Sequence, residues 1–134
     1  METLVFKRSG LYLGIEIEFI RQVVDDVAIA PVPLAPPGYT GLIYHRGELF
    51  EVADLGVIIK KEKAVKSKSA LKILLKWNQK GIALAADEII GLKSLKENNN
   101  EPEKLTFEGK TIEIITPEGV WKMLSELPYG PCQI

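Results

Sequence analysis

This sequence has little of what metal, redox or hydrolytic catalysis requires. Among 134 residues there is one histidine, His45, and one cysteine, Cys132. A zinc site draws several ligands from Cys, His and carboxylates, and a single cysteine cannot pair within its own chain. Neither a Gly-rich phosphate loop nor a serine nucleophile motif accompanies His45. We therefore expect no catalytic residue, no metal and no cofactor. We interpret His45 as an exposed turn or interface residue and Cys132 as an incidental thiol.

Long apolar runs and a strong net charge are also missing. No apolar run approaches the roughly 20 residues that span a bilayer, and METLVFKRSG turns polar too early for a secretory signal. The formal net charge is −1, from 17 basic and 18 acidic residues, which provides no global attraction to nucleic acid or anionic membranes. We expect a soluble, cytoplasmic protein with no membrane insertion, whose partners recognise local patches. The sparse use of cysteine fits a reducing compartment.

What is present is an internal repeat. Segments 4–24 and 71–92 each contain a strand, a Gly-containing turn, an apolar strand and then a carboxylate, Glu18 or Asp87. Because carboxylates are favoured at the positive amino end of a helix, we expect a short helix after each of these two residues. A second pair, RGELFEV at 46–52 and EGKTIEI at 108–114, reads as a Gly-closed turn that enters a strand.

The repeat predicts a single, mainly β domain made of two related β-barrel or sandwich halves, with little helix. We expect a first half at about 1–59, a basic connector at 60–70 and a second half at 71–134. The lysine-rich stretch KKEKAVKSKSALK and the polar stretch KENNNEPEK at 96–104 are interpreted as solvated loops. Three aromatic residues are most simply core residues and are alternatively interface anchors: Trp77, Trp121 and Tyr129.

Residues 30–55 are the most informative stretch. Four prolines stiffen its first part, which lowers the entropy lost on binding. They are Pro31, Pro33, Pro36 and Pro37. A hairpin follows, in which 42–44 face 49–52 across a connection of His45, Arg46 and Gly47. We expect Arg46 at an exposed tip, where its guanidinium suits a carboxylate or backbone carbonyls of another protein. We expect Asp54 to cap the turn that ends the second strand.

This stretch resembles the CheW-like adaptor domains of bacterial chemosensory arrays. Those domains carry I-x-P-V-P-x-x-P and then G-V-I-N-L-R-G-x-x-x-P-V-x-D-L, and this chain matches their order and spacing. The matching positions are Ile29, Pro31, Val32, Pro33, Pro36, Gly41, Leu42, Ile43, Arg46, Gly47, Val52, Asp54 and Leu55. GLYLGIEIEFIRQVV upstream and IALAADEIIGLKSL downstream are similar to two further family segments. Together the four elements extend over about 115 residues.

The resemblance implies a fold of two small five-stranded β-barrels and no enzymatic activity. It implies an adaptor that binds the regulatory domain of a CheA-type histidine kinase and the cytoplasmic tip of a chemoreceptor. The receptor would enter a groove between the barrels, and the arginine of the R-G motif would lie within that region. Carried over, the receptor-side residues are Val32, Ile43, Arg46 and Gly47. Pro31, Pro33, Gly41 and Asp54 belong to the structural motif.

Three departures from the family pattern leave alternatives open. Tyr44 and His45 replace the usual Asn-Leu, and Glu51 stands where proline is common. The carboxyl-terminal part, TIEIITPEGVWKML, appears shortened, so no kinase-side residue is assigned. One alternative is an orphan CheW-like protein that serves another pathway. The other is a small β-barrel that binds oligonucleotides through the lysine connector and Trp77, although no nucleic-acid partner is expected because arginine and aromatics are not interleaved there.

Overall fold

The computed structural model describes residues 2–60, 71–94, 104–107 and 109–127. Expectations about the connector at 61–70, the polar loop at 96–103, Tyr129 and Cys132 lie outside these residues. Within the described part the elements follow one another as β1 (Glu2–Arg8), β2 (Leu11–Glu16), the 3-10 helix η1 (Ile17–Phe19), β3 (Ile20–Val24), β4 (Tyr39–His45), β5 (Glu48–Ala53), α1 (Leu55–Lys60), β6 (Leu71–Trp77), β7 (Lys80–Ala86), β8 (Glu88–Ser94), β9 (Lys104–Phe107), β10 (Lys110–Ile114) and α2 (Pro117–Ser125).

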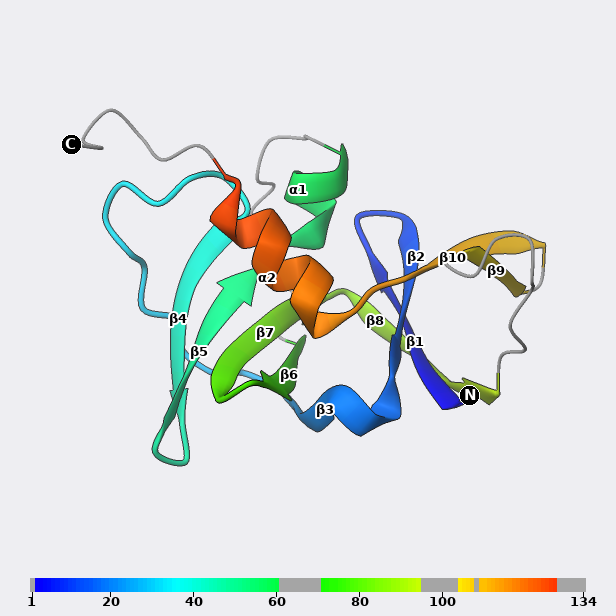
Figure 1. Cartoon of the computed structure of the whole chain (residues 1–134), viewed down its shortest axis with the longest axis horizontal. Helices are drawn as coiled ribbons and strands as arrows, with labels where there is room; N and C mark the ends of the chain where they lie inside the picture. The colour runs from blue at the N-terminus through cyan, green and yellow to red at the C-terminus, as the bar shows by residue number, and fades with distance from the viewer. Residues whose placement is uncertain (1, 61–70, 95–103, 108, 128–134) are drawn as a thin grey trace.

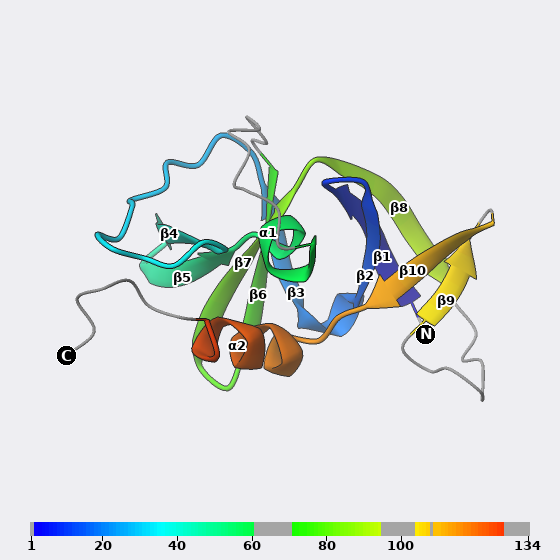
Figure 2. The ribbon, with the colours of Figure 1, turned by 90° about the horizontal axis from the view of Figure 1, so that it is seen from above.

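The strands form two five-stranded sheets that lie side by side (Figures 1 and 2). The first sheet has the order β8-β1-β2-β10-β9, and the second has the order β3-β6-β7-β5-β4. Each contains one parallel pair, β2 with β10 and β5 with β7, and its other pairs are antiparallel. The expected mainly β fold with two five-stranded units is confirmed.

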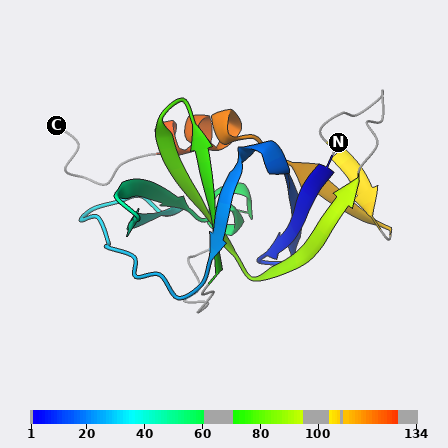
Figure 3. The ribbon, with the colours of Figure 1, turned by 90° about the horizontal axis from the view of Figure 1, so that it is seen from below.

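Each sheet takes strands from both halves of the sequence. β1 and β2 share a sheet with β8, β9 and β10, whereas β6 and β7 share a sheet with β3, β4 and β5. Figure 3 shows the chain passing from β2 of the first sheet to β3, which lies beside β6 in the second, and from β7 of the second sheet to β8, which lies beside β1 in the first. The two sheets therefore exchange strands between the halves at 1–59 and 71–134, and neither half builds a sheet alone.

Period-two alternation explains the core, because successive side chains of a strand point to opposite faces. On β1, Leu4 and Phe6 join a central cluster, while Val5 packs on the other face of the first sheet with Ile112. On β6, Ile73 joins the central cluster, while Leu74 packs with Ile43, Phe50 and Val52 on the opposite face of the second sheet. Both sheets are therefore covered by apolar side chains on two faces, as in a pair of packed barrels.

The helices are not where the sequence predicts them. Glu18 lies in the three-residue η1, and residues 20–24 form β3; Asp87 is followed directly by β8. The expected helices after these carboxylates are wrong, because both segments hydrogen-bond as edge strands to the opposite half, β3 to β6 and β8 to β1. The real helices follow β5 and β10 instead. No helix in the described ranges is long and apolar enough to cross a membrane.

α2 begins at the end of β10, at the place that the sequence presents as shortened. Thr116 caps it, with its Oγ1 accepting from the Gly119 N–H at 3.0 Å, and Pro117 occupies the first turn, where its missing N–H costs nothing. Val120 and Leu124 then enter the central cluster. This end of the chain therefore completes the central core.

Candidate functional site

The β4–β5 hairpin closes in a two-residue turn. Tyr44 pairs with Leu49 and His45 with Glu48, which leaves Arg46 and Gly47 as the connection. Both have positive φ, 50° and 81°, as a type I′ turn requires. Arg46 is exposed, as the sequence predicts. His45 ends the strand rather than belonging to the turn, and its Nε2 lies 3.2 Å from Gln22 Oε1.

The two faces of the hairpin differ sharply. Ile43 and Phe50 pair across the strands and are buried, at 0% and 1% exposure. The neighbouring pair points the other way, with Tyr44 70% and Leu49 60% exposed. Ile43, one of the receptor-side residues that the resemblance implies, therefore has a buried side chain, and its part in binding stays a prediction. Sequence reasoning missed Tyr44 and Leu49, which alternation from a buried Ile43 would have revealed.

The proline-rich loop precedes β4 and presents a second exposed surface. Pro31 and Pro33 are exposed and Val32 is half-buried. Pro33 and Leu34 are the central residues of a turn in which the Ala35 N–H donates to the Val32 carbonyl at 3.2 Å. Leu34 has φ 62° and is 57% exposed, an unusual combination for a bulky apolar residue. It is a residue that sequence reasoning did not single out.

Gly41 is required where the loop meets β4. The strand forms a bridge to Ala30, in which the Leu42 N–H donates to the Ala30 carbonyl at 2.9 Å and the Ala30 N–H donates to the Leu42 carbonyl at 2.8 Å. A Cβ on Gly41 would lie 2.4 Å from the Ala30 carbonyl oxygen, and the residue has φ 150°. The expected structural role of Gly41 thus has a steric cause.

The structure does not bring Val32 and Arg46 together. Ala30 of the loop bridges Leu42 in the middle of β4, and from there the loop runs antiparallel to the strand, so Val32 lies toward the first residue of β4 whereas Arg46 follows the last. Figure 1 shows the hairpin tip pointing away from the first sheet, at the opposite end of β4 from the loop. The place of Arg46 in the receptor-binding region, which the resemblance implies, stays a prediction. The predicted site divides into a loop surface and a tip surface.

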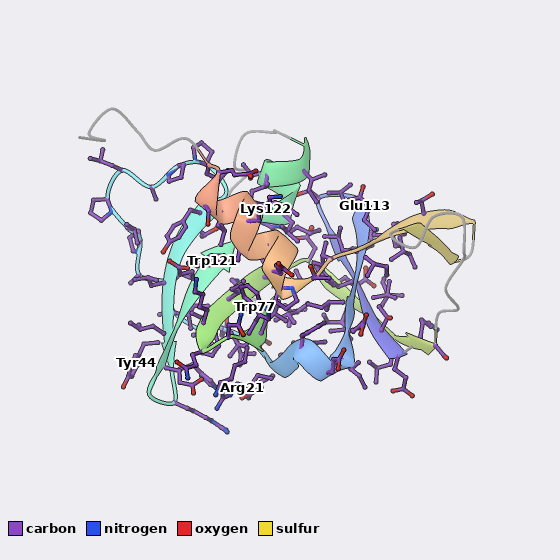
Figure 4. The ribbon with its side chains drawn as sticks, in the orientation of Figure 1. Arg21, Tyr44, Trp77, Glu113, Trp121 and Lys122 are labelled. Atoms are coloured by element: carbon purple, nitrogen blue, oxygen red, sulfur yellow. The ribbon has the colours of Figure 1, made fainter. Side chains whose placement is uncertain are left out.

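The tip surface is rich in cations. Arg21 of β3 lies at this end of the second sheet with Tyr44 (Figure 4), and its Nη1 is 2.8 Å from Glu48 Oε2. Lys76 Nζ lies 3.7 Å from the other oxygen of Glu48. Arg46 projects from the turn beside them. This group of exposed charged side chains at the hairpin tip suits recognition of another protein.

Asp54 has a structural role at the other end of β5. Its Oδ1 accepts from the Gly56 N–H at 3.0 Å and so caps α1, close to the capping role expected from the sequence. The carboxylate also receives Arg8 in a bidentate pair, Nε to Oδ1 at 3.0 Å and Nη2 to Oδ2 at 2.6 Å. Burial alone would raise the pKa of Asp54, but hydrogen bonds and charge from Arg8 outweigh it and lower that pKa.

Asp87 is the second partner of Arg8. Its Oδ1 lies 2.6 Å from Arg8 Nη1, and its Oδ2 accepts from the Ser9 N–H at 2.8 Å. The hydrogen bonds that Arg8 donates to Asp54, the negative charge of Asp54, and the hydrogen bond and charge of Asp87 raise the pKa of Arg8 despite its burial. The carboxylate predicted to open a helix is therefore used in a tertiary ion pair.

The remaining chemistry-bearing residues are scattered over the described part of the chain. In the part of the chain that the structure describes, no three His, Cys, Asp or Glu side chains are placed to hold a metal. Trp77 is half-buried, and half-buried Trp121 packs against the central cluster with Lys80 Nζ 3.6 Å from its ring centroid. Figure 4 shows both tryptophans within the body of the molecule.

Comparisons with known proteins agree with this fold. The family model described as CheW-like domain matches residues 2–123. A comparison with curated proteins finds no match. The crystal structure of the scaffolding protein TtCheW from Thermoanaerobacter tengcongensis is similar, with a TM-score of 0.73 and 24% identity, over 87% of this chain and 84% of that one. That likeness concerns the fold, whereas the family match extends over most of the sequence. The chain belongs to the family of CheW-like domains.

Proposed function

We propose that this chain is a non-catalytic, cytoplasmic adaptor of bacterial chemotaxis that joins a CheA-type histidine kinase to the cytoplasmic tip of a chemoreceptor. The observation that carries the proposal is the family match over residues 2–123. The fold supports it, because both proposed contact surfaces are on rigid, exposed elements and neither requires a chemical step.

Within this proposal, the hairpin tip recognises a partner through Arg46. The tight turn holds the backbone of Arg46 at a defined position, so only the side chain has to be ordered when the guanidinium binds a carboxylate or carbonyl. Gly47 permits the turn and leaves its outer side open, since no atom lies within 4 Å of a Cβ built there. The loop of Pro31, Val32 and Pro33 supplies a separate apolar contact.

A pull-down tests the proposal. The purified chain is immobilised and offered the regulatory domain of a CheA-type kinase and, separately, a receptor cytoplasmic fragment. Capture of both, competed by the free chain, is the expected result. Capture of neither contradicts the coupling role, and the orphan alternative then takes its place.

A further inference from the structure

A pocket of about 370 Å³ opens between the ends of two hairpins, β4–β5 and β6–β7. Leu49 and Phe50 line it from β5, and Gly81 lines it from β7. A Cβ on Gly81 would lie 2.3 Å from the Leu49 carbonyl oxygen and 2.9 Å from Phe50 Cδ1. The glycine therefore allows the two strands to approach closely and leaves the pocket wall free of a side chain.

Cations surround this pocket. Lys76 and Lys80 are exposed on its rim, and Arg46 and Arg21 belong to the adjoining strand ends. Glu48 is the carboxylate of the rim, and it is shared by Arg21 and Lys76. Within the described part of the chain, neither Lys80 nor Arg46 has an ion-pair partner. Because the whole protein has a net charge of −1, this excess of positive charge is local.

Apolar surface accompanies the charge. Leu49 is 60% exposed at the pocket, and Tyr44, its cross-strand partner, is 70% exposed. An apolar centre with charged groups around it is the usual composition of a protein-binding patch. A single-stranded nucleic acid instead needs open aromatic faces for its bases. Here Phe50 is 1% exposed and Lys80 covers the ring of Trp121, which leaves Tyr44 as the exposed ring beside the pocket instead of the row of stacking rings that successive bases use.

We infer that this pocket binds an acidic segment of a protein partner. An aliphatic side chain of that segment packs against the exposed Leu49, while neighbouring carboxylates pair with Lys76 and Lys80. The inference rests on the proposed function only in assigning the segment to the kinase or the receptor. The chemistry of the pocket can be tested without either protein.

The test uses a fluorescein-labelled peptide of alternating Glu and Leu and a matched peptide of Gln and Leu. Anisotropy titrations compare the wild type with Lys76→Glu/Lys80→Glu and with the control Lys110→Glu, an exposed lysine of the first sheet. Turning two attractive charge pairs into repulsive ones should weaken binding of the Glu-Leu peptide about tenfold. The control should bind as the wild type does, and raising salt should weaken the wild type.

Three results would overturn the inference: no binding of the Glu-Leu peptide, equal binding of both peptides, or unchanged binding by the double variant. Tighter binding of a single-stranded oligonucleotide than of the peptide would also overturn it. Circular dichroism verifies that each variant is folded. If the kinase and receptor fragments are captured but the Glu-Leu peptide does not bind, the proposed role of the pocket is contradicted and the adaptor role is supported. If the peptide binds but neither fragment is captured, the pocket is supported and the adaptor role is contradicted.

Discussion

Arg8 Nη2 lies 2.6 Å from Asp54 Oδ2, and this buried pair joins the end of β1 in the first sheet to the end of β5 in the second. Both side chains are at most 9% exposed. The same guanidinium reaches Asp87 at the junction of β7 and β8. One cation thus ties the end of β1 both to the end of β5 and to the point where the chain passes from the second sheet to the first.

Replacing Arg8 by Met should destabilise the protein strongly. Removing one member of a buried pair leaves the other charge uncompensated, which costs about 3 to 5 kcal/mol. Urea unfolding followed by circular dichroism measures the loss. Asp87→Asn is the matched control, because that side chain is 38% exposed and its pair should contribute less than about 1 kcal/mol. Equal losses for the two variants would contradict the central position of the Arg8–Asp54 pair.

Acid should remove the contribution of Asp54. Its pKa in the folded protein is lowered, so the stabilisation is present above the unfolded pKa of about 4 and is lost as pH falls toward the folded pKa. The urea midpoint should therefore drop between about pH 5 and pH 2. In Asp54→Asn the pH-dependent part of this drop should shrink, and an identical pH profile in that variant would show that other carboxylates cause it.

Leu34→Gly should stabilise the protein. A left-handed conformation costs an L-residue about 1 to 2 kcal/mol, and glycine gives back part of this through its own entropy, for a net gain of roughly 0.5 to 1 kcal/mol. Thermal unfolding gives the change. Leu49→Gly is the control with similar exposure in an ordinary strand conformation, and it should lower stability. A lower melting temperature for Leu34→Gly would mean that the exposed leucine packs more than its surface indicates.

Arg46→Asn should weaken partner binding by about 1 to 3 kcal/mol, the range for a charge-assisted contact at an interface. Asparagine tolerates the positive φ of position 46, so the turn is kept while the guanidinium is lost. Calorimetric titration with the receptor fragment and the kinase domain measures both affinities. Unchanged affinity for both proteins would show that Arg46 is not part of the binding site.

Local patterns predicted the local structure well. The hairpin around Arg46 and Gly47 follows from alternating residues and a glycine, and the strand pairs β1–β2 and β6–β7 follow from the repeat. The same reasoning failed at Glu18 and Asp87. A carboxylate before an apolar stretch is compatible with a helix cap, but Asp87 is used by Arg8, 79 residues away, and the backbone after it pairs with β1.

The sequence by itself determined a duplicated, mainly β domain of the CheW-like family with an exposed arginine on a tight turn, because turns, alternation and motifs depend on near neighbours. The tertiary structure alone decided that strands cross between the two halves, that Ile43 is buried, and that Val32 and Arg46 lie at opposite ends of β4. It also placed Lys76 and Lys80 beside Leu49. These features depend on pairing between segments far apart in the chain, where burying both faces of each sheet outweighs local preference.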